Sequence, residues 1–138
     1  MRTIRKNFWK PFLFGCVGLF VAIVVFAANP FEEPSAPGTP VAVDWGGDYC
    51  EIEFTPPLSD GGAPVTHYIV QGLDKYSPSW VEKGKYIPTT EENKRKIIRC
   101  RVNDLIEGYT YYFRAIAVNK AGPSEPSGVS QPITIKKR

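Results

Sequence analysis

The 138-residue sequence predicts an all-β domain, a sandwich of seven antiparallel strands, preceded by a hydrophobic N-terminal helix. From Gly38 onward, apolar and polar residues alternate in short runs, which is the period of half-buried strands. Clusters of Gly, Pro, Asn and Asp separate the runs, and 12 of the 13 prolines follow residue 29. No helical period competes with this pattern in that part of the chain.

The N-terminal segment, residues 1–28, contains an uncharged run at 12–28 that follows four cations within the first ten residues. As a helix this run would span roughly 25 Å, slightly less than the ~30 Å hydrocarbon core of a bilayer. The small residues at 25 and 27 also suit cleavage by a signal peptidase, whereas the preceding cations favour a single-pass anchor. A transmembrane anchor, a cleaved signal peptide and a mis-predicted exon therefore remain three alternatives.

Seven runs beyond the linker are predicted to be strands, at residues 41–44, 50–54, 67–71, 80–86, 96–102, 110–119 and 129–135. Pro132 lies inside the last run and lacks the N–H that a ladder requires, so pairing should resume only at residues 133–135. The turns between the runs contain proline or residues that tolerate positive φ, as at 55–57, 59–62 and 119–123.

The alternation assigns side chains to the two faces of each strand. In the second strand, Cys50, Ile52 and Phe54 share one face while Glu51 and Glu53 share the other. The same rule predicts an inward-facing set on the fifth and sixth strands: Ile98, Cys100, Val102, Tyr111, Phe113, Ala115 and Ala117. Two such inner faces packed together form a sandwich.

The charges argue against several classes of function. Residues 29–138 carry 13 basic and 14 acidic side chains, so nucleic acid is not expected as a partner. His67 is the only histidine, and no cysteine cluster has zinc spacing, so we expect no metal and no cofactor. No catalytic constellation is present, which predicts that the protein is not an enzyme. The charged run at 91–96 is either a docking patch or a solvated loop.

A set of motifs in fixed order carries a resemblance to a known family. The motifs are Pro37-Gly38-x-Pro40, Val43-Asp44-Trp45, Phe54-x-Pro56-Pro57, Asp60-Gly61-Gly62-x-Pro64-Val65-x-x-Tyr68, Trp80, Leu105-x-Glu107-Gly108-x-x-Tyr111-x-Phe113-Arg114-x-x-Ala117-x-Asn119 and Ala121-Gly122-Pro123-Ser124-x-Pro126-Ser127. Together they resemble the fibronectin type III domain, an immunoglobulin-like sandwich, and most of all the versions in titin and twitchin.

The resemblance implies a domain at residues 38–136, joined to whatever precedes it by a linker at 29–37. It implies a structural core that contains Phe54, Tyr68, Trp80, Leu105, Tyr111 and Phe113. Phe54 stands where the family usually has tryptophan. Tyr111, six residues after Leu105, is expected to tie its hydroxyl back to the upstream chain.

Cys50 and Cys100 invite comparison with the disulfide of immunoglobulin domains. Cys100 falls one strand too early for that bridge, and Phe113 occupies the position of the second cysteine. We therefore expect two buried free thiols, with a strained cross-strand disulfide as the alternative.

Two functional hypotheses follow. The first is a non-catalytic structural and protein-interaction module, a fragment of a titin/twitchin-like muscle protein, located in the cytoplasm within the sarcomere and flanked by neighbouring domains of a tandem array. The second is a membrane-anchored or secreted adhesion module tethered through residues 12–28.

Overall fold

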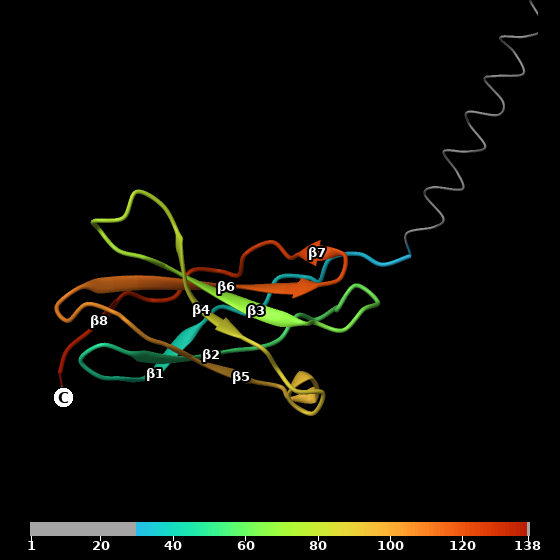
Figure 1. The fold of residues 1–138 in the computed structure, drawn as a ribbon, viewed down its shortest axis with the longest axis horizontal. Coiled ribbons are helices and arrows are strands. Elements are labelled where there is room, and N and C mark those ends of the chain that lie inside the picture. Colours follow the sequence, from blue (N-terminus) through green and yellow to red (C-terminus); the bar gives the residue numbers. More distant parts are fainter. Residues whose placement is uncertain (1–29, 138) are drawn as a thin grey trace, which may run out of the picture. The chain divides into compact units, whose positions relative to one another are not determined.

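Two antiparallel β-sheets face each other in the computed structural model, which describes residues 30–137 (Figure 1). One sheet has the order β1-β2-β5, and the other has the order β4-β3-β6-β7 with β8 also paired to β6. The strands are β1 (Val41–Trp45), β2 (Cys50–Phe54), β3 (His67–Leu73), β4 (Val81–Tyr86), β5 (Ile98–Val102), β6 (Thr110–Asn119), β7 (Gly122–Pro123) and β8 (Ile133–Thr134), and a short 3-10 helix, η1 (Glu92–Lys94), precedes β5. The predicted all-β sandwich is confirmed.

The predicted N-terminal helix lies outside the described residues. Between residues 30 and 137, no helix has the length and apolar character needed to cross a bilayer.

The core lies between the inner faces that the alternation predicts. Every second residue of β2 and β5 is buried, as are Tyr111, Phe113, Ala115 and Ala117 of β6. Val70 of β3, Val65 and Ile135 complete the same apolar cluster. Burying each large apolar side chain contributes about 1.5–3 kcal/mol, so this cluster supplies the main stabilisation of the sandwich.

The predicted last strand at 129–135 is wrong in its extent. Only Ile133–Thr134 form a strand, β8, and the separate short strand β7 precedes it, so the described residues contain eight strands and not seven. As expected from Pro132, pairing begins at Ile133, which lies opposite Tyr111. Between β7 and β8 the chain still follows β6, but it does so with a period of three residues.

Three buried serines produce this period. The backbone N–H groups of Ser124, Ser127 and Ser130 donate to the carbonyls of Ala117, Ala115 and Phe113 at 2.7, 2.8 and 2.8 Å. Each serine Oγ then accepts the N–H of the same β6 residue, at 3.0, 2.8 and 2.9 Å respectively. The side-chain oxygen therefore takes the place of a strand carbonyl, and we call this arrangement the serine ladder. Its three-residue repeat is that of a polyproline II helix and not of a pleated strand.

Candidate functional site

Residues 31–35 of the predicted linker lie against one end of the sandwich. The Glu32 N–H donates to the Gly61 carbonyl at 3.0 Å, and the Ser35 N–H donates to the Ser59 carbonyl at 2.9 Å. The Ser35 hydroxyl also accepts the Ser59 N–H at 3.0 Å. Pro34 is buried within the same stretch. These contacts attach the entering chain to the β2–β3 loop.

Asn119, at the end of β6, joins this linker to two turns. Its Nδ2 donates to the Glu32 carbonyl at 2.8 Å and to the Asp60 carbonyl at 2.7 Å. Its Oδ1 accepts the N–H groups of Ala121 and Gly122 at 2.8 and 3.2 Å. The side chain is only 3% exposed, so this single amide bridges the linker, the β2–β3 loop and the β6–β7 turn.

Gly61 and Lys120 also take part in this contact. We call the contact the linker clamp and define it as residues 31–35, 59–62 and 119–122. Gly61 has φ of 75°, and a Cβ there would lie 2.0 Å from the Glu32 carbonyl oxygen. A side chain at this position would therefore displace the linker. On the other side, the Lys120 ammonium lies 3.5 Å from the centroid of the Phe31 ring, a cation–π contact.

The C-terminal end of the chain is attached at the other end of β6. The Ile135 N–H donates to the Tyr109 carbonyl at 2.9 Å, and the Ile135 carbonyl accepts the Gly108 N–H at 2.8 Å. The ten residues of β6 separate this contact from Asn119, a distance of roughly 30 Å at about 3.4 Å per residue. Figure 1 shows the described chain entering the sandwich at one end and leaving at the opposite end.

The structure places five of the six predicted core residues inside the sandwich. Phe54, Tyr68, Leu105, Tyr111 and Phe113 are each no more than 4% exposed. Phe54 contacts Tyr68 edge-on, with ring centroids 5.2 Å apart.

Trp80 departs from that expectation. It is half-buried and is not part of the core cluster. The Arg114 guanidinium lies 4.3 Å from the centroid of its ring, and the Arg114 Nε also donates to Gln71 Oε1 at 2.7 Å. Because Arg114 and Gln71 point to the outer face of the larger sheet, Trp80 covers that face and does not fill the interior.

Tyr111 makes the bond that its position predicts. Its hydroxyl oxygen accepts the N–H of Ile106 at 3.0 Å, five residues upstream. Burial raises the pKa of Tyr111, while the Ile106 bond opposes that shift. The side chain thus fixes the β5–β6 loop at the end of the domain where the C-terminal strand is attached.

Cys50 and Cys100 are buried and free. In the β2–β5 register, Cys50 lies opposite Val102 and Cys100 lies opposite Ile52, so the cysteines are not a directly facing pair. Burial raises the pKa of both thiols to about 11, with a further contribution at Cys50 from the carboxylates of Asp44 and Glu51. Both groups are therefore protonated at neutral pH, which does not suit a nucleophile or a metal ligand.

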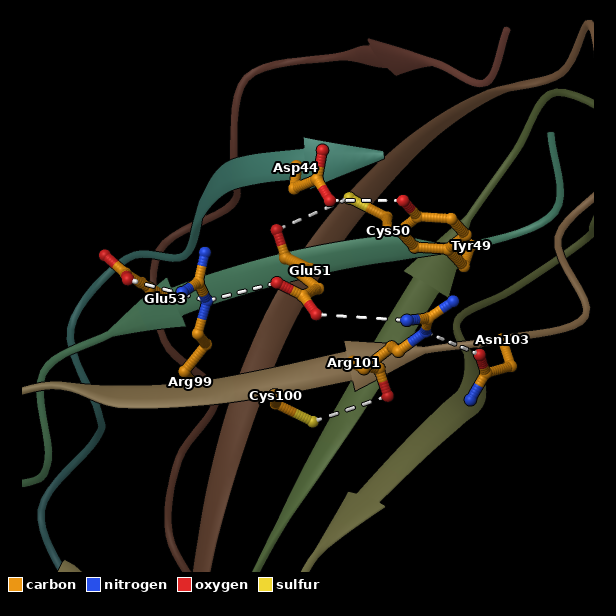
Figure 2. A network of polar contacts seen from close by, with 9 residues as sticks. All are labelled: Asp44, Tyr49, Cys50, Glu51, Glu53, Arg99, Cys100, Arg101 and Asn103. Atoms are coloured by element: carbon orange, nitrogen blue, oxygen red, sulfur yellow. Dashed lines mark hydrogen bonds and ion pairs between the residues drawn. The ribbon is translucent and has the colours of Figure 1, made fainter. Parts of the chain in front are cut away.

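The outer face of the smaller sheet carries a charged network (Figure 2). The Arg99 Nε lies 3.2 Å from a Glu51 carboxylate oxygen and 3.8 Å from one of Glu53. The Arg101 guanidinium lies 4.0 Å from Glu51 and stacks over the Tyr49 ring at 3.7 Å. Since the arginine side chains are more than half exposed to solvent, which screens the charges, the pairs contribute little stability.

The remaining candidates do not form a catalytic or metal site. His67 Nδ1 is hydrogen-bonded to its neighbour Thr66 at 2.9 Å, and Glu92 and Lys94 of the charged run belong to η1. In the portion of the chain that the structure describes, no three His, Cys, Asp or Glu side chains are grouped to hold a metal ion.

The sequence patterns missed the two most connected features, namely the bridging role of Asn119 and the serine ladder. The sequence patterns place Asn119 at the end of the strand 110–119 and at the start of the following turn, and they give its side chain no partner. For the ladder, the available signal was the spacing of three residues between Ser124, Ser127 and Ser130, which a search for period two does not register.

Two facing antiparallel sheets define an immunoglobulin-like sandwich, and comparison with known proteins identifies its family. The family model of the fibronectin type III domain matches residues 35–133. The chain therefore belongs to the fibronectin type III family.

Its relatives include muscle proteins. It is 38% identical over 103 residues to cardiac-type myosin-binding protein C of Gallus gallus, covering 73% of this chain and 7% of that protein. It is also 34% identical over 105 residues to the titin homolog of Caenorhabditis elegans. This match covers 76% of this chain but so small a part of that protein that the share rounds to 0%. The chain thus spans only a small part of the curated relatives that it matches.

Solved structures of muscle proteins contain domains with a similar fold. A crystal structure of titin domains superposes with a TM-score of 0.65 at 30% identity, covering 78% of this chain and 34% of that one. The twitchin kinase region of Caenorhabditis elegans gives a TM-score of 0.63 at 28% identity, covering 76% of this chain and 17% of that one. The domain is therefore similar to modules of titin, twitchin and myosin-binding protein C.

Proposed function

We propose that this domain is a non-catalytic linkage and interaction module of a titin/twitchin-like muscle protein, one unit in a tandem array within the sarcomere. The observation that carries the proposal is that the segments entering and leaving the sandwich are attached at opposite ends of β6. The entering linker is held by Asn119, and the leaving strand is held by Tyr109 and Gly108. A force applied between neighbouring domains would pass through these contacts.

The direction of the strands favours resistance to such a force. β1 follows the linker and pairs antiparallel with β2, while the segment from Ser124 to Ile135 follows β6. Pulling the two chain ends apart would slide each terminal segment along its neighbour. Because the bonds of an antiparallel ladder are perpendicular to the strands, many of them would be loaded at once.

The proposal includes the limits of the module. We assign residues 29–37 to an interdomain linker and residues 38–136 to the sandwich, with the chain as a fragment of a longer protein. The relatives support the proposal that the chain is a fragment, because each is far longer than the matched region. Under this proposal, neighbouring domains are the first partners of the module.

A second candidate is a membrane-anchored or secreted module, which the uncharged run at 12–28 favours. Subcellular fractionation of the native product distinguishes the two. Recovery with myofibrils supports the muscle module, whereas recovery in membranes after carbonate extraction supports the anchored one.

Single-molecule pulling tests the mechanical proposal. Residues 29–138, held by their ends between marker domains, should unfold in one cooperative event. Ile133→Pro should lower the unfolding force, because it interrupts the short strand β8 opposite Tyr111. Lys94→Ala, in the exposed η1, is the matched control and should leave the force unchanged. Gradual extension, or an equal effect of both substitutions, would contradict a load-bearing role for the terminal strand.

A further inference from the structure

The side of the sandwich between β4 and β5 presents two unpaired strand edges. β5 is the last strand of the smaller sheet and β4 is the last strand of the larger one, so neither has an outer neighbour among the described residues. Outer edges of this kind carry backbone N–H and C=O groups that can pair with an added strand.

The two edges enclose a groove. At one end β4 touches β5, since a Cβ at Gly84 would lie 2.9 Å from a Val102 methyl. Elsewhere the edges leave a space of about 470 Å³ that is lined by Tyr86, Ile97 and Cys100 together with charged side chains. Ile97, just before β5, is 53% exposed. The groove thus has an exposed apolar residue in its lining.

The charged lining has an excess of cations. Lys85, Arg95, Arg99 and Arg101 contribute four positive charges, against the two carboxylates of Glu51 and Glu92. Glu51 is already engaged by Arg99 and Arg101, as Figure 2 shows. The Glu92 carboxylate accepts the Thr89 N–H at 2.8 Å, and this bond lowers its pKa. Lys85 and Arg95 make no ion pair within 4.0 Å among those found in residues 30–137, although the charge of Arg95 also helps to lower the pKa of Glu92.

We propose that the groove between β4 and β5 binds an extended acidic segment of a partner protein, which pairs as a strand with the part of the β5 edge that β4 does not contact. Carboxylates on one face of that segment meet Lys85 and Arg95, and apolar side chains on the other face cover Ile97. The charge selects this occupant, because a second copy of the same edge would bring like charges together. The inference does not depend on the tandem-array function.

Fluorescence anisotropy with the full chain in non-ionic detergent tests the proposal. The probe is a labelled ten-residue peptide of alternating valine and glutamate, and its matched control replaces glutamate with lysine. We expect the acidic peptide to bind at least tenfold more tightly than the basic one, with an affinity that falls as salt rises. Equal binding of the two peptides would overturn the proposal.

Two further comparisons locate the contact. Lys85→Glu combined with Arg95→Glu should weaken binding of the acidic peptide at least tenfold. Lys136→Glu combined with Lys137→Glu changes the net charge equally at the exposed C-terminal end and should alter binding less than twofold. Equal losses in the two double variants would show a general charge effect and would refute the groove.

Strand pairing is tested on the unaltered protein. An acidic peptide with an N-methyl group on every amide has no backbone donor left on either edge and cannot form a ladder, so it should bind at least tenfold more weakly. Unchanged binding of this peptide would exclude strand addition. Tighter binding of a ten-residue deoxythymidine strand than of the acidic peptide would assign the surface to nucleic acid, contrary to the proposal.

Discussion

The linker clamp makes Asn119 the most informative residue to replace. Asn119→Ala removes four hydrogen bonds, two donated to the Glu32 and Asp60 carbonyls and two accepted from Ala121 and Gly122. Each contributes about 0.5–1.5 kcal/mol net. Because the four partner residues are at least partly exposed, water can replace some of these bonds. We therefore expect a loss of about 2–3 kcal/mol in the free energy of unfolding.

Urea denaturation of residues 29–138 measures this loss. For a domain of this size, with a slope of about 1.5 kcal/mol per molar urea, the midpoint should fall by roughly 1 to 2 M at an unchanged slope. Asn103→Ala is the matched control, since Asn103 is exposed and accepts one bond from Arg101. That control should change the free energy by less than about 0.5 kcal/mol.

Hydrogen exchange separates the clamp from general destabilisation. In Asn119→Ala, the amides of Glu32 and Ser35 should exchange faster than global unfolding permits, because the linker detaches while the sandwich stays folded. Asn119→Asp adds a charge test. Its carboxylate would face two carbonyl oxygens, so its pKa would be raised in the folded state, and stability should be regained as the pH falls below that pKa. Midpoints equal to those of Asn103→Ala would refute the bridging role.

The remaining predictions concern the core and the serine ladder. Tyr111→Phe should lower the free energy of unfolding by about 1–2 kcal/mol, because the Ile106 N–H loses its acceptor; an unchanged denaturation midpoint would contradict the bond. Ser127→Ala leaves the N–H of buried Ala115 without its Oγ acceptor and should cost about 1–3 kcal/mol, whereas the exposed Ser79→Ala should cost almost nothing in the same denaturation experiment. Native Cys50 and Cys100 should resist thiol labelling at neutral pH, and rapid labelling would show that they are accessible. Since their folded pKa of about 11 exceeds the ordinary value of about 8.5, stability should be complete below pH ~8.5 and decline toward pH 11, a decline that Cys→Ala variants should lessen.

The fold and the two buried faces follow from local patterns. In β2, β5 and β6, alternation alone identifies which side chains are buried, because the period of a strand separates its faces whatever strand lies beside it. The same reasoning places Tyr111 and both cysteines inward. Trp80 shows the limit of the method, since its position depends on Arg114, a residue of another strand that covers the ring.

The antiparallel sandwich, the residues that face its core and the delay of the last pairing at Pro132 can all be inferred from local sequence patterns. How the terminal segments are held depends on contacts between distant parts of the chain. Asn119 and Glu32 lie 87 positions apart, and the serines of the ladder replace strand carbonyls only because β6 lies beside them. Buried residues recur in the sequence with the period of the strand, whereas a polar side chain can form a hydrogen bond with any suitable group nearby. The identity of that partner is fixed only when distant parts of the chain pack together.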